Sequence, residues 1–202
     1  LSIRRQRQMC IRDSPSSEQI NSIKNVSHQF FDKKKFIIIA AGRLSPEKDF
    51  ETLIRAFAIV KYKIPCKLII IGEGPERDSL GDLIIDLNLS SDVLLPGFVN
   101  NPLDWISCSS LFVLSSLSEA FGNVLVEAMA CGIPVVSTSC NSGPEEILEN
   151  GKWGWLVPPQ NAEALSQAIY DGLTCSRSPD VVLRAQSFSI ARSVARYLEV
   201  LN

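Results

Sequence analysis

Two carboxylates, Glu119 and Glu127, are separated by seven residues in the centre of the chain. A short apolar run at 111–114 comes before them and is typical of a buried strand, and a helix is expected to begin near Gly122 or Asn123. A strand, a loop and a helix N-terminus in this order form an anion site, because unpaired backbone amides point at the ligand. The carboxylates add acceptors for hydroxyl groups. An anion beside hydroxyls is the chemical description of a sugar nucleotide.

Two cations stand in a second loop, which begins at Gly42 and carries Arg43 and Lys48. Arginine offers a bidentate fork and lysine a point charge, and this pairing suits a diphosphate. The alternative interpretation is a solvated loop whose cations pair with neighbouring acids. Taken alone, this loop does not decide between them.

A third loop contains Gly72 and Gly74. Glycines permit close approach of the backbone to a ligand, but the third glycine of the dinucleotide fingerprint is absent. Taken alone, the pair is better explained by ordinary turn chemistry. Glu127 also has a structural alternative, because a carboxylate near a helix N-terminus is favoured by the helix dipole.

These loops must be positioned by regular elements, and short apolar runs alternate with segments of helical period. Continuous apolar runs rich in β-branched residues predict strands that are buried on both faces. The predicted strands are 36–41, 67–71, 93–95, 111–114, 134–138 and 155–157. The predicted helices are 47–62, 76–87, 102–109, 161–173 and 179–201, with two more that begin near 122 and 142.

Alternation of this kind predicts an α/β fold, a Rossmann-like doubly wound parallel sheet of six strands. Ligands bind such sheets outside the carboxyl ends of the strands. Five loops rich in glycine, charge or small polar residues are expected to meet there: 42–48, 72–75, 97–101, 115–123 and 139–144.

Composition excludes several classes of function. The chain has 202 residues and a net charge of −2, which gives no basic footprint for nucleic acid. No apolar run approaches the roughly 18 residues that span a bilayer. The six cysteines show no C-x-x-C spacing and the single histidine, His28, lies outside the five loops, so we expect neither a metal site nor a disulfide framework.

Four segments make up the expected organisation. Residues 36–176 form the nucleotide-sugar-binding domain, 177–202 form C-terminal helices, and 15–35 form a linker or edge segment. Residues 1–14 carry four arginines without an apolar period, and we expect a leader foreign to the natural protein, because the string resembles translated sequencing-adapter read-through. A targeting peptide and a basic surface arm are the alternatives.

Several motifs occur together in a fixed order. They are Gly42-Arg43-Leu44 with Lys48, Gly72-x-Gly74-Pro75, Glu119-x7-Glu127 with the intervening Phe121-Gly122-Asn123-Val124-Leu125-Val126, and Gly132-x-Pro134-Val135-Val136. Over residues 36–174 this set resembles the retaining glycosyltransferases of family 4. The segment 140–147 is similar to members that build bacterial surface polysaccharides from UDP-sugars.

The resemblance implies the GT-B architecture, in which this chain is the C-terminal, donor-binding domain. It implies that Arg43 and Lys48 neutralise the donor diphosphate and that Glu119 contacts hydroxyls of the transferred sugar. It further implies that Glu127 holds the ribose and that no metal is needed. The implied donor-binding positions are Gly42, Gly72, Gly74, Phe98, Phe121, Gly122, Asn123, Val124 and Glu127.

The implied activity is transfer of a hexosyl group from a nucleoside-diphosphate sugar, with UDP as the expected nucleotide, to a glycan or lipid-linked acceptor. The family places the acceptor site on an N-terminal domain that this sequence lacks, so we expect the chain alone to bind donor weakly and transfer nothing. A cytoplasmic location at the inner face of the membrane is expected, with peripheral membrane association of the full protein.

Three other functions are compatible with parts of the pattern. A nucleotide-sugar epimerase shares the layout but would need acid and base residues, and the five loops contain no histidine. A dinucleotide-dependent oxidoreductase would need G-x-G-x-x-G after the first strand, where the sequence has Gly42-Arg43-Leu44 instead. A non-catalytic module that binds sugar nucleotides stays open.

Overall fold

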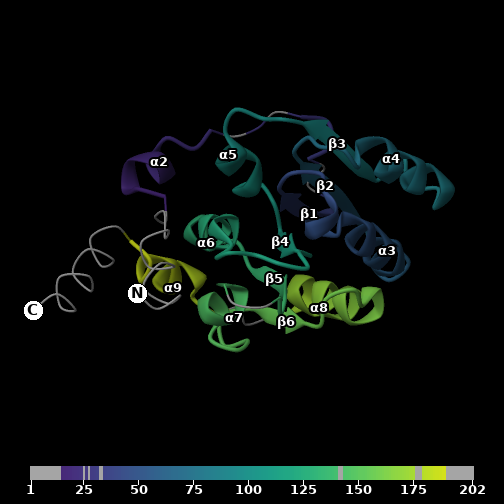
Figure 1. The fold of residues 1–202 in the computed structure, drawn as a ribbon. Coiled ribbons are helices and arrows are strands. Elements are labelled where there is room, and N and C mark those ends of the chain that lie inside the picture. Colours follow the sequence, from purple (N-terminus) through teal and green to yellow (C-terminus); the bar gives the residue numbers. More distant parts are fainter. Residues whose placement is uncertain are drawn as a thin grey trace, which may run out of the picture.

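The computed structural model describes residues 15–189, apart from 25, 27, 32, 33, 141, 142 and 176–178. A single parallel sheet forms the centre, with strand order β3-β2-β1-β4-β5-β6 (Figure 1). Its strands are β1 (Phe36–Ala41), β2 (Cys66–Ile71), β3 (Val93–Gly97), β4 (Leu111–Leu114), β5 (Val135–Thr138) and β6 (Trp155–Val157). The α/β, doubly wound fold predicted from the alternating pattern is therefore confirmed.

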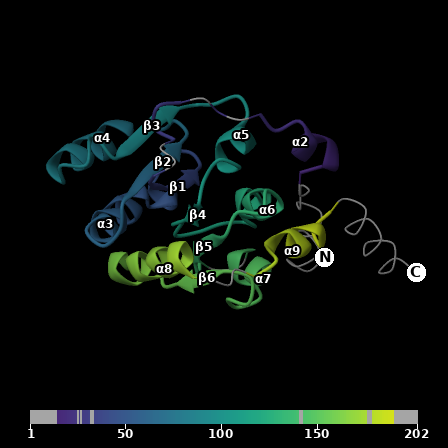
Figure 2. The same cartoon turned by 180° about the vertical axis from the view of Figure 1, so that it is seen from behind.

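Helices cover both faces of this sheet, as Figures 1 and 2 show. The described helices are α2 (Ser17–Asn21), η1 (Pro46–Lys48), α3 (Phe50–Lys61), α4 (Arg77–Asp86), α5 (Pro102–Ile106), α6 (Asn123–Ala130), α7 (Gly143–Leu148), α8 (Ala162–Thr174) and α9 (Val181–Gln186). One face packs against α3, α4 and α8 and the other against α5, α6, α7 and α9. None of the helices in the described ranges is long and apolar enough to cross a membrane.

Strand β1 shows why the continuous apolar runs become central strands. Ile38 and Ala40 lie in the core on one side of the sheet, and Ile37 and Ile39 lie in the core on the other. Because successive side chains point to opposite faces, a strand buried on both faces needs an apolar residue at every position. The predicted and observed bounds of β1 and β4 coincide.

The helix predicted over 47–62 is divided. Residues 46–48 form the 3-10 turn η1, and α3 begins only at Phe50. Between them Asp49 adopts a left-handed conformation with φ 47°, and its carboxylate accepts a hydrogen bond from the amide of Thr52. A short polar residue tolerates this conformation and caps the helix at once. Apolar periodicity does not register such a local reversal.

Other boundaries also differ from the sequence prediction. The last predicted helix, 179–201, ends at Gln186 within the described residues, and positions 190–202 lie outside them. The short helix α2 was not predicted; Ser16 and Gln19 form a reciprocal capping box at its start. Farther along the same segment Phe30 packs into the core, where the ammonium group of Lys67 lies 4.3 Å from its ring centroid.

The loops after β1 and β2 pack directly against each other. The amide of Gly42 donates to the carbonyl of Ile71, and the amide of Leu44 donates to the carbonyl of Glu73. A Cβ atom at Gly72 would lie 1.8 Å from the Gly42 carbonyl oxygen, and φ at Gly72 is +141°. Glycine is therefore required for this backbone contact, whether or not a ligand is present.

We expect Gly72→Ala to lower the free energy of unfolding by at least about 2 kcal/mol, because the Cβ atom collides with backbone that cannot move aside. Gly81→Ala is the matched control: this position lies within α4 and a Cβ there would meet nothing within 4 Å. It should stabilise the chain by about 0.5–1 kcal/mol. Urea unfolding measures both, and equal effects of the two substitutions would contradict the contact described.

Candidate functional site

The carboxyl ends of all six strands lie at one edge of the sheet, because every strand pair is parallel. The strand order reverses between β1 and β4, which are neighbours although they are distant in the chain. Chain leaving β1 continues into α3 on one face, and chain leaving β4 continues into α6 on the other face. Ligands of doubly wound folds bind in the crevice at such a reversal.

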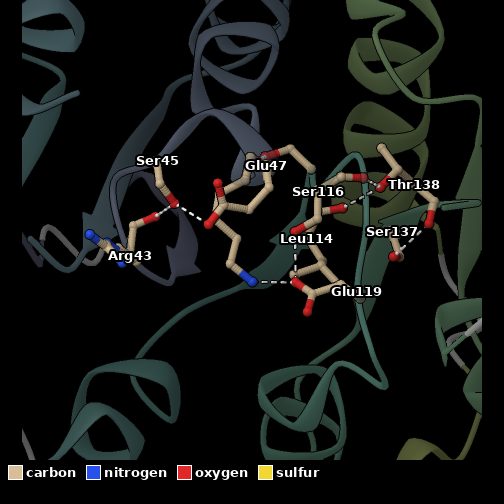
Figure 3. A network of polar contacts seen from close by, with 10 residues as sticks. Arg43, Ser45, Glu47, Leu114, Ser116, Glu119, Ser137 and Thr138 are labelled. Atoms are coloured by element: carbon tan, nitrogen blue, oxygen red, sulfur yellow. Dashed lines mark hydrogen bonds and ion pairs between the residues drawn. The ribbon is translucent and has the colours of Figure 1, made fainter. Parts of the chain in front are cut away.

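Lys48 and Glu119 meet across this reversal. The Lys48 Nζ lies 2.5 Å from Glu119 Oε1, and the two side chains are only 21% and 11% exposed (Figure 3). The hydroxyl of Ser116 donates to the same carboxylate oxygen at 2.7 Å. The sequence predicted Lys48 for a diphosphate and Glu119 for a sugar, and the structure pairs the two side chains with each other.

Three further contacts join the loops around this ion pair. Ser115 Oγ donates to the Lys48 carbonyl at 2.7 Å, and the amide of Leu117 donates to the Glu47 carbonyl at 2.8 Å. From β5, the hydroxyl of Thr138 donates to the Ser116 carbonyl at 2.5 Å. Sequence reasoning missed these hydroxyl residues, and their one signal was their position at the ends of apolar strands.

Arg43 lies at the exposed rim of the loop after β1. Two residues farther along, Ser45 is buried. Its hydroxyl donates to Glu47 Oε1 at 2.7 Å and makes a longer contact of 3.3 Å with the Arg43 carbonyl. The hydrogen bond from Ser45 is the main cause of the lowered pKa of Glu47. The loop is thus shaped by its own side chains and presents the guanidinium group to solvent.

The N-terminus of α6 has the properties of an anion site. Gly122 precedes the helix in a left-handed conformation, with φ 96° and ψ 50°. Among the described residues no side chain caps the first amides of α6, and Asn123 Oδ1 is buried without a hydrogen-bond partner. Open amides at a helix start attract negative charge. Val124 follows in the same first turn and is partly buried.

Phe121 fixes the turn that leads into α6. Its ring is buried and meets the ring of Phe188 edge-on, with centroids 5.6 Å apart. On the other side, a Cβ atom at Gly143 would lie 1.8 Å from the Phe121 carbonyl oxygen. The side chain of Phe121 is therefore a packing element, and only its backbone remains for a ligand.

Glu127 is partly buried in the second turn of α6. Burial raises the pKa of its carboxyl group, and no cation among the described residues contributes to offset that shift. The nearby thiol of Cys131 has its pKa raised to about 11, by burial first and by the charge of Glu127 second. An ionised carboxylate in this position lacks compensation within the described chain, so hydrogen-bond donors from a ligand would stabilise it.

The remaining predicted positions differ in character. Gly72 and Gly74 are both explained by packing of the loop after β1, because a Cβ at Gly74 would lie 2.2 Å from the Leu44 carbonyl oxygen. Gly42 is less constrained, since a Cβ there would make an ordinary contact of 3.4 Å with Lys48. Phe98 follows β3 and is 77% exposed, which is unusual for an aromatic ring.

Two further expectations from the sequence concern metal ligands and the single histidine. Within the described ranges, His, Cys, Asp and Glu nowhere form a group of three that could hold a metal ion. His28 packs against Trp105 of α5, with ring centroids 5.6 Å apart.

We expect Glu127→Gln to stabilise the chain at neutral pH. A raised carboxyl pKa means that the folded state resists ionisation, so the carboxyl group's contribution to stability is present below the unfolded value near 4.5 and is lost as pH rises through the folded pKa. Glu127→Gln removes this loss of stability, because glutamine does not ionise. The variant should therefore have a higher free energy of unfolding in urea at neutral pH, and the difference from wild type should disappear in acid.

Glu149→Gln is the contrasting control, because hydrogen bonding to Trp153 and then Lys152 lowers the pKa of Glu149. The contribution of the Glu149 carboxyl group to stability is present above its unfolded pKa and is lost as pH falls through its folded pKa. This variant should therefore lower stability at neutral pH. A destabilised Glu127→Gln protein at pH 7 would contradict the unpaired state of that carboxylate.

The Lys48–Glu119 pair should show strong energetic coupling. In a double-mutant cycle with Lys48→Met and Glu119→Gln, we expect a coupling free energy of about 1–3 kcal/mol, because both side chains are largely shielded from water. The exposed pair Arg55–Glu51 is the matched control and should give about 0.3–0.5 kcal/mol. Chemical denaturation measures both cycles, and similar couplings would refute the ion pair across β1 and β4.

The chain matches known proteins over most of its length. Residues 22–184 match the model of the family described as Glycosyl transferases group 1. The N-acetylgalactosamine-N,N'-diacetylbacillosaminyl-diphospho-undecaprenol 4-alpha-N-acetylgalactosaminyltransferase of Campylobacter jejuni is 38% identical over 174 residues, which are 82% of this chain and 47% of that protein. The lipopolysaccharide core biosynthesis glycosyltransferase LpsE of Rhizobium meliloti is 36% identical over 134 residues, 66% of this chain and 38% of that protein. The chain thus spans less than half the length of these curated relatives.

Solved structures agree with the sequence relatives. Anabaena Alr3699/HepE in complex with UDP and glucose superposes with a TM-score of 0.74 at 27% identity, over 90% of this chain and 54% of that one. The apo form of the lipopolysaccharide outer core galactosyltransferase WaaB shares the fold with a TM-score of 0.79 at 19% identity, over 95% of this chain and 54% of that one. By its match to the family model and by these relatives, the chain belongs to the group 1 glycosyltransferases.

Proposed function

We propose that this chain binds the donor of a retaining glycosyltransferase, which transfers a hexosyl group from a UDP-sugar to a glycan or lipid-linked acceptor in surface polysaccharide biosynthesis. The observation that carries the proposal is the meeting of Lys48 and Glu119 at the reversal of strand order, next to the start of α6, which no side chain of the described residues caps. A cation, a carboxylate and open amides together match a diphosphate joined to a sugar.

The diphosphate would be held by charge rather than by a metal ion. As the bond between the sugar and the diphosphate breaks, negative charge grows on the leaving UDP. Groups already aimed at that charge stabilise the transition state more than the ground state. The groups proposed for this role are the exposed Arg43, the partly buried Lys48 and the amides at the start of α6.

The two carboxylates would have separate partners. Glu127 would accept hydrogen bonds from the ribose hydroxyls, which would offset the burial of a carboxylate that no cation among the described residues compensates. Glu119 would accept from hydroxyls of the transferred sugar, while the diphosphate takes over part of the contact with Lys48. Phe98, exposed after β3, would lie against the base.

Similar proteins support the choice of donor and acceptor. Alr3699/HepE was solved with UDP and glucose, and the name of the Campylobacter jejuni enzyme describes a diphospho-undecaprenol-linked acceptor. Because the chain spans less than half of that enzyme, we propose that turnover needs the whole protein and that these 202 residues alone bind donor without transferring sugar.

Calorimetric titration with UDP tests the donor site. Arg43→Ala should weaken binding by about 1.5–3 kcal/mol, the value of a hydrogen bond to a charged group, and Glu127→Gln should weaken it about tenfold or more. Glu127→Gln should weaken UDP binding even though it is expected to stabilise the fold, which separates loss of a ligand contact from loss of folding.

Arg55→Ala is the matched control, because Arg55 is an exposed arginine of α3 that pairs with Glu51. It should leave the affinity for UDP unchanged. Titrations with GDP and ADP test the proposed nucleotide, and UDP is expected to bind most tightly. Equal affinity of wild type, Arg43→Ala and Glu127→Gln for UDP would refute the assigned site.

A further inference from the structure

Two buried hydroxyl groups stand behind Glu119. Ser116 and Thr138 are 0% and 1% exposed, and they come from the ends of neighbouring strands β4 and β5 (Figure 3). Thr138 Oγ1 donates to the carbonyl of Ser116 at 2.5 Å, and Ser116 Oγ donates to Glu119 Oε1 at 2.7 Å. The hydrogen bonds thus run in one direction, from β5 through the end of β4 to the carboxylate.

This arrangement restrains a side chain that would otherwise rotate. Glu119 lies in the loop after β4, and a glutamate has several rotatable bonds whose freedom must be lost when it meets a ligand. Ser116 and Lys48 contact the same carboxylate oxygen. The ammonium supplies charge but has no fixed direction, whereas the buried hydroxyl is fixed by its backbone.

Thr138 determines where that backbone lies. Its hydroxyl is directed at the carboxyl end of β4, with the Ser116 carbonyl as the close acceptor and the Leu114 carbonyl a longer contact at 3.4 Å. The paired residue in the sheet, Ser137 opposite Leu114, shows that β5 is in register there. A hydroxyl on β5 therefore sets the path of the chain that leaves β4.

We propose that Ser116 and Thr138 are positioning residues for recognition of the donor sugar: Ser116 orients the carboxylate of Glu119, and Thr138 acts through Ser116. This inference rests on the proposed function, in which Glu119 contacts the transferred sugar. The hydroxyls of Ser116 and Thr138 would then affect binding of the sugar and not binding of the nucleotide. A carboxylate held in one orientation before binding loses less entropy when the sugar arrives.

The test separates the sugar from the nucleotide. The 202-residue chain is titrated with UDP and with UDP-glucose, UDP-galactose, UDP-N-acetylglucosamine and UDP-N-acetylgalactosamine. The readout is the ratio of the dissociation constant for UDP to that for the tightest UDP-sugar. Ser116→Ala and Thr138→Val should each lower this ratio by about fivefold or more, as expected when a charged hydrogen bond is lost or misdirected. The dissociation constant for UDP itself should change less than twofold.

Two further variants distinguish positioning from a general effect on packing. Thr138→Ser keeps the hydroxyl and should retain the wild-type ratio. Ser166→Ala removes another buried hydroxyl, which donates to the Glu163 carbonyl within α8, and should leave both constants unchanged. Far-ultraviolet circular dichroism reports whether each variant is folded, and Thr138→Val serves if Ser116→Ala is not.

Each outcome decides the proposal. A ratio that both variants leave unchanged, or affinities for UDP and UDP-sugar that fall equally, would overturn the role of the hydroxyls. If the wild type binds no UDP-sugar more tightly than it binds UDP, the role of the hydroxyls is overturned too. That result would leave the proposed nucleotide site intact. Failure of wild type to bind UDP, or indifference of UDP binding to Arg43→Ala, would instead refute the proposed function on which the inference rests.

Discussion

The parallel pairing of β1 with β4 is the constraint on which the site depends. These strands are distant in the sequence, and their pairing places the loops that carry Lys48 and Glu119 side by side. The helices that follow the two strands lie on opposite faces of the sheet, and ligands of doubly wound folds bind where the strand order reverses in this way. Hydrogen bonds between the loops, such as the one from Ser115 Oγ to the Lys48 carbonyl, then hold the two loops in position relative to each other. Fold and candidate site are consequences of one strand order.

The start of α6 concentrates features that a merely stable protein would avoid. Gly122 gives up side-chain capping, Asn123 buries an unpartnered oxygen, and Glu127 holds a carboxylate that burial disfavours. Each is unfavourable for folding, and all three lie within six consecutive residues of the chain. Local rules of stability tend to be broken where a ligand completes the interactions. Packing of Phe121 against Phe188 supplies stabilisation beside them.

Much of this could be predicted from the sequence, and the failures have physical causes. Strands β1 and β4 were predicted to the residue, because burial on both faces demands unbroken apolar runs. The division at Asp49 was missed, since a single left-handed residue leaves no periodic signal. Lys48 and Glu119 were expected at the same edge of the sheet, and the structure brings them together, but the hydrogen bonds of Ser116 and Thr138 were not expected. Buried hydroxyls are recognised by their partners, and the carbonyl that accepts from Thr138 belongs to Ser116, 22 positions earlier in the chain and after a different strand.

The exposed ring of Phe98 has a consequence for how such a site can change over generations. Gly72 and Gly74 are locked by backbone contacts, so substitution there disturbs the fold together with any ligand. Phe98 is 77% exposed and supports almost nothing around it. A residue free of packing duties can be replaced at little loss of stability. In the proposed site, single substitutions after β3 would therefore change the preference for the base at little loss of stability. The loops proposed to hold the diphosphate are built into the sheet, so substitutions there would also disturb the fold.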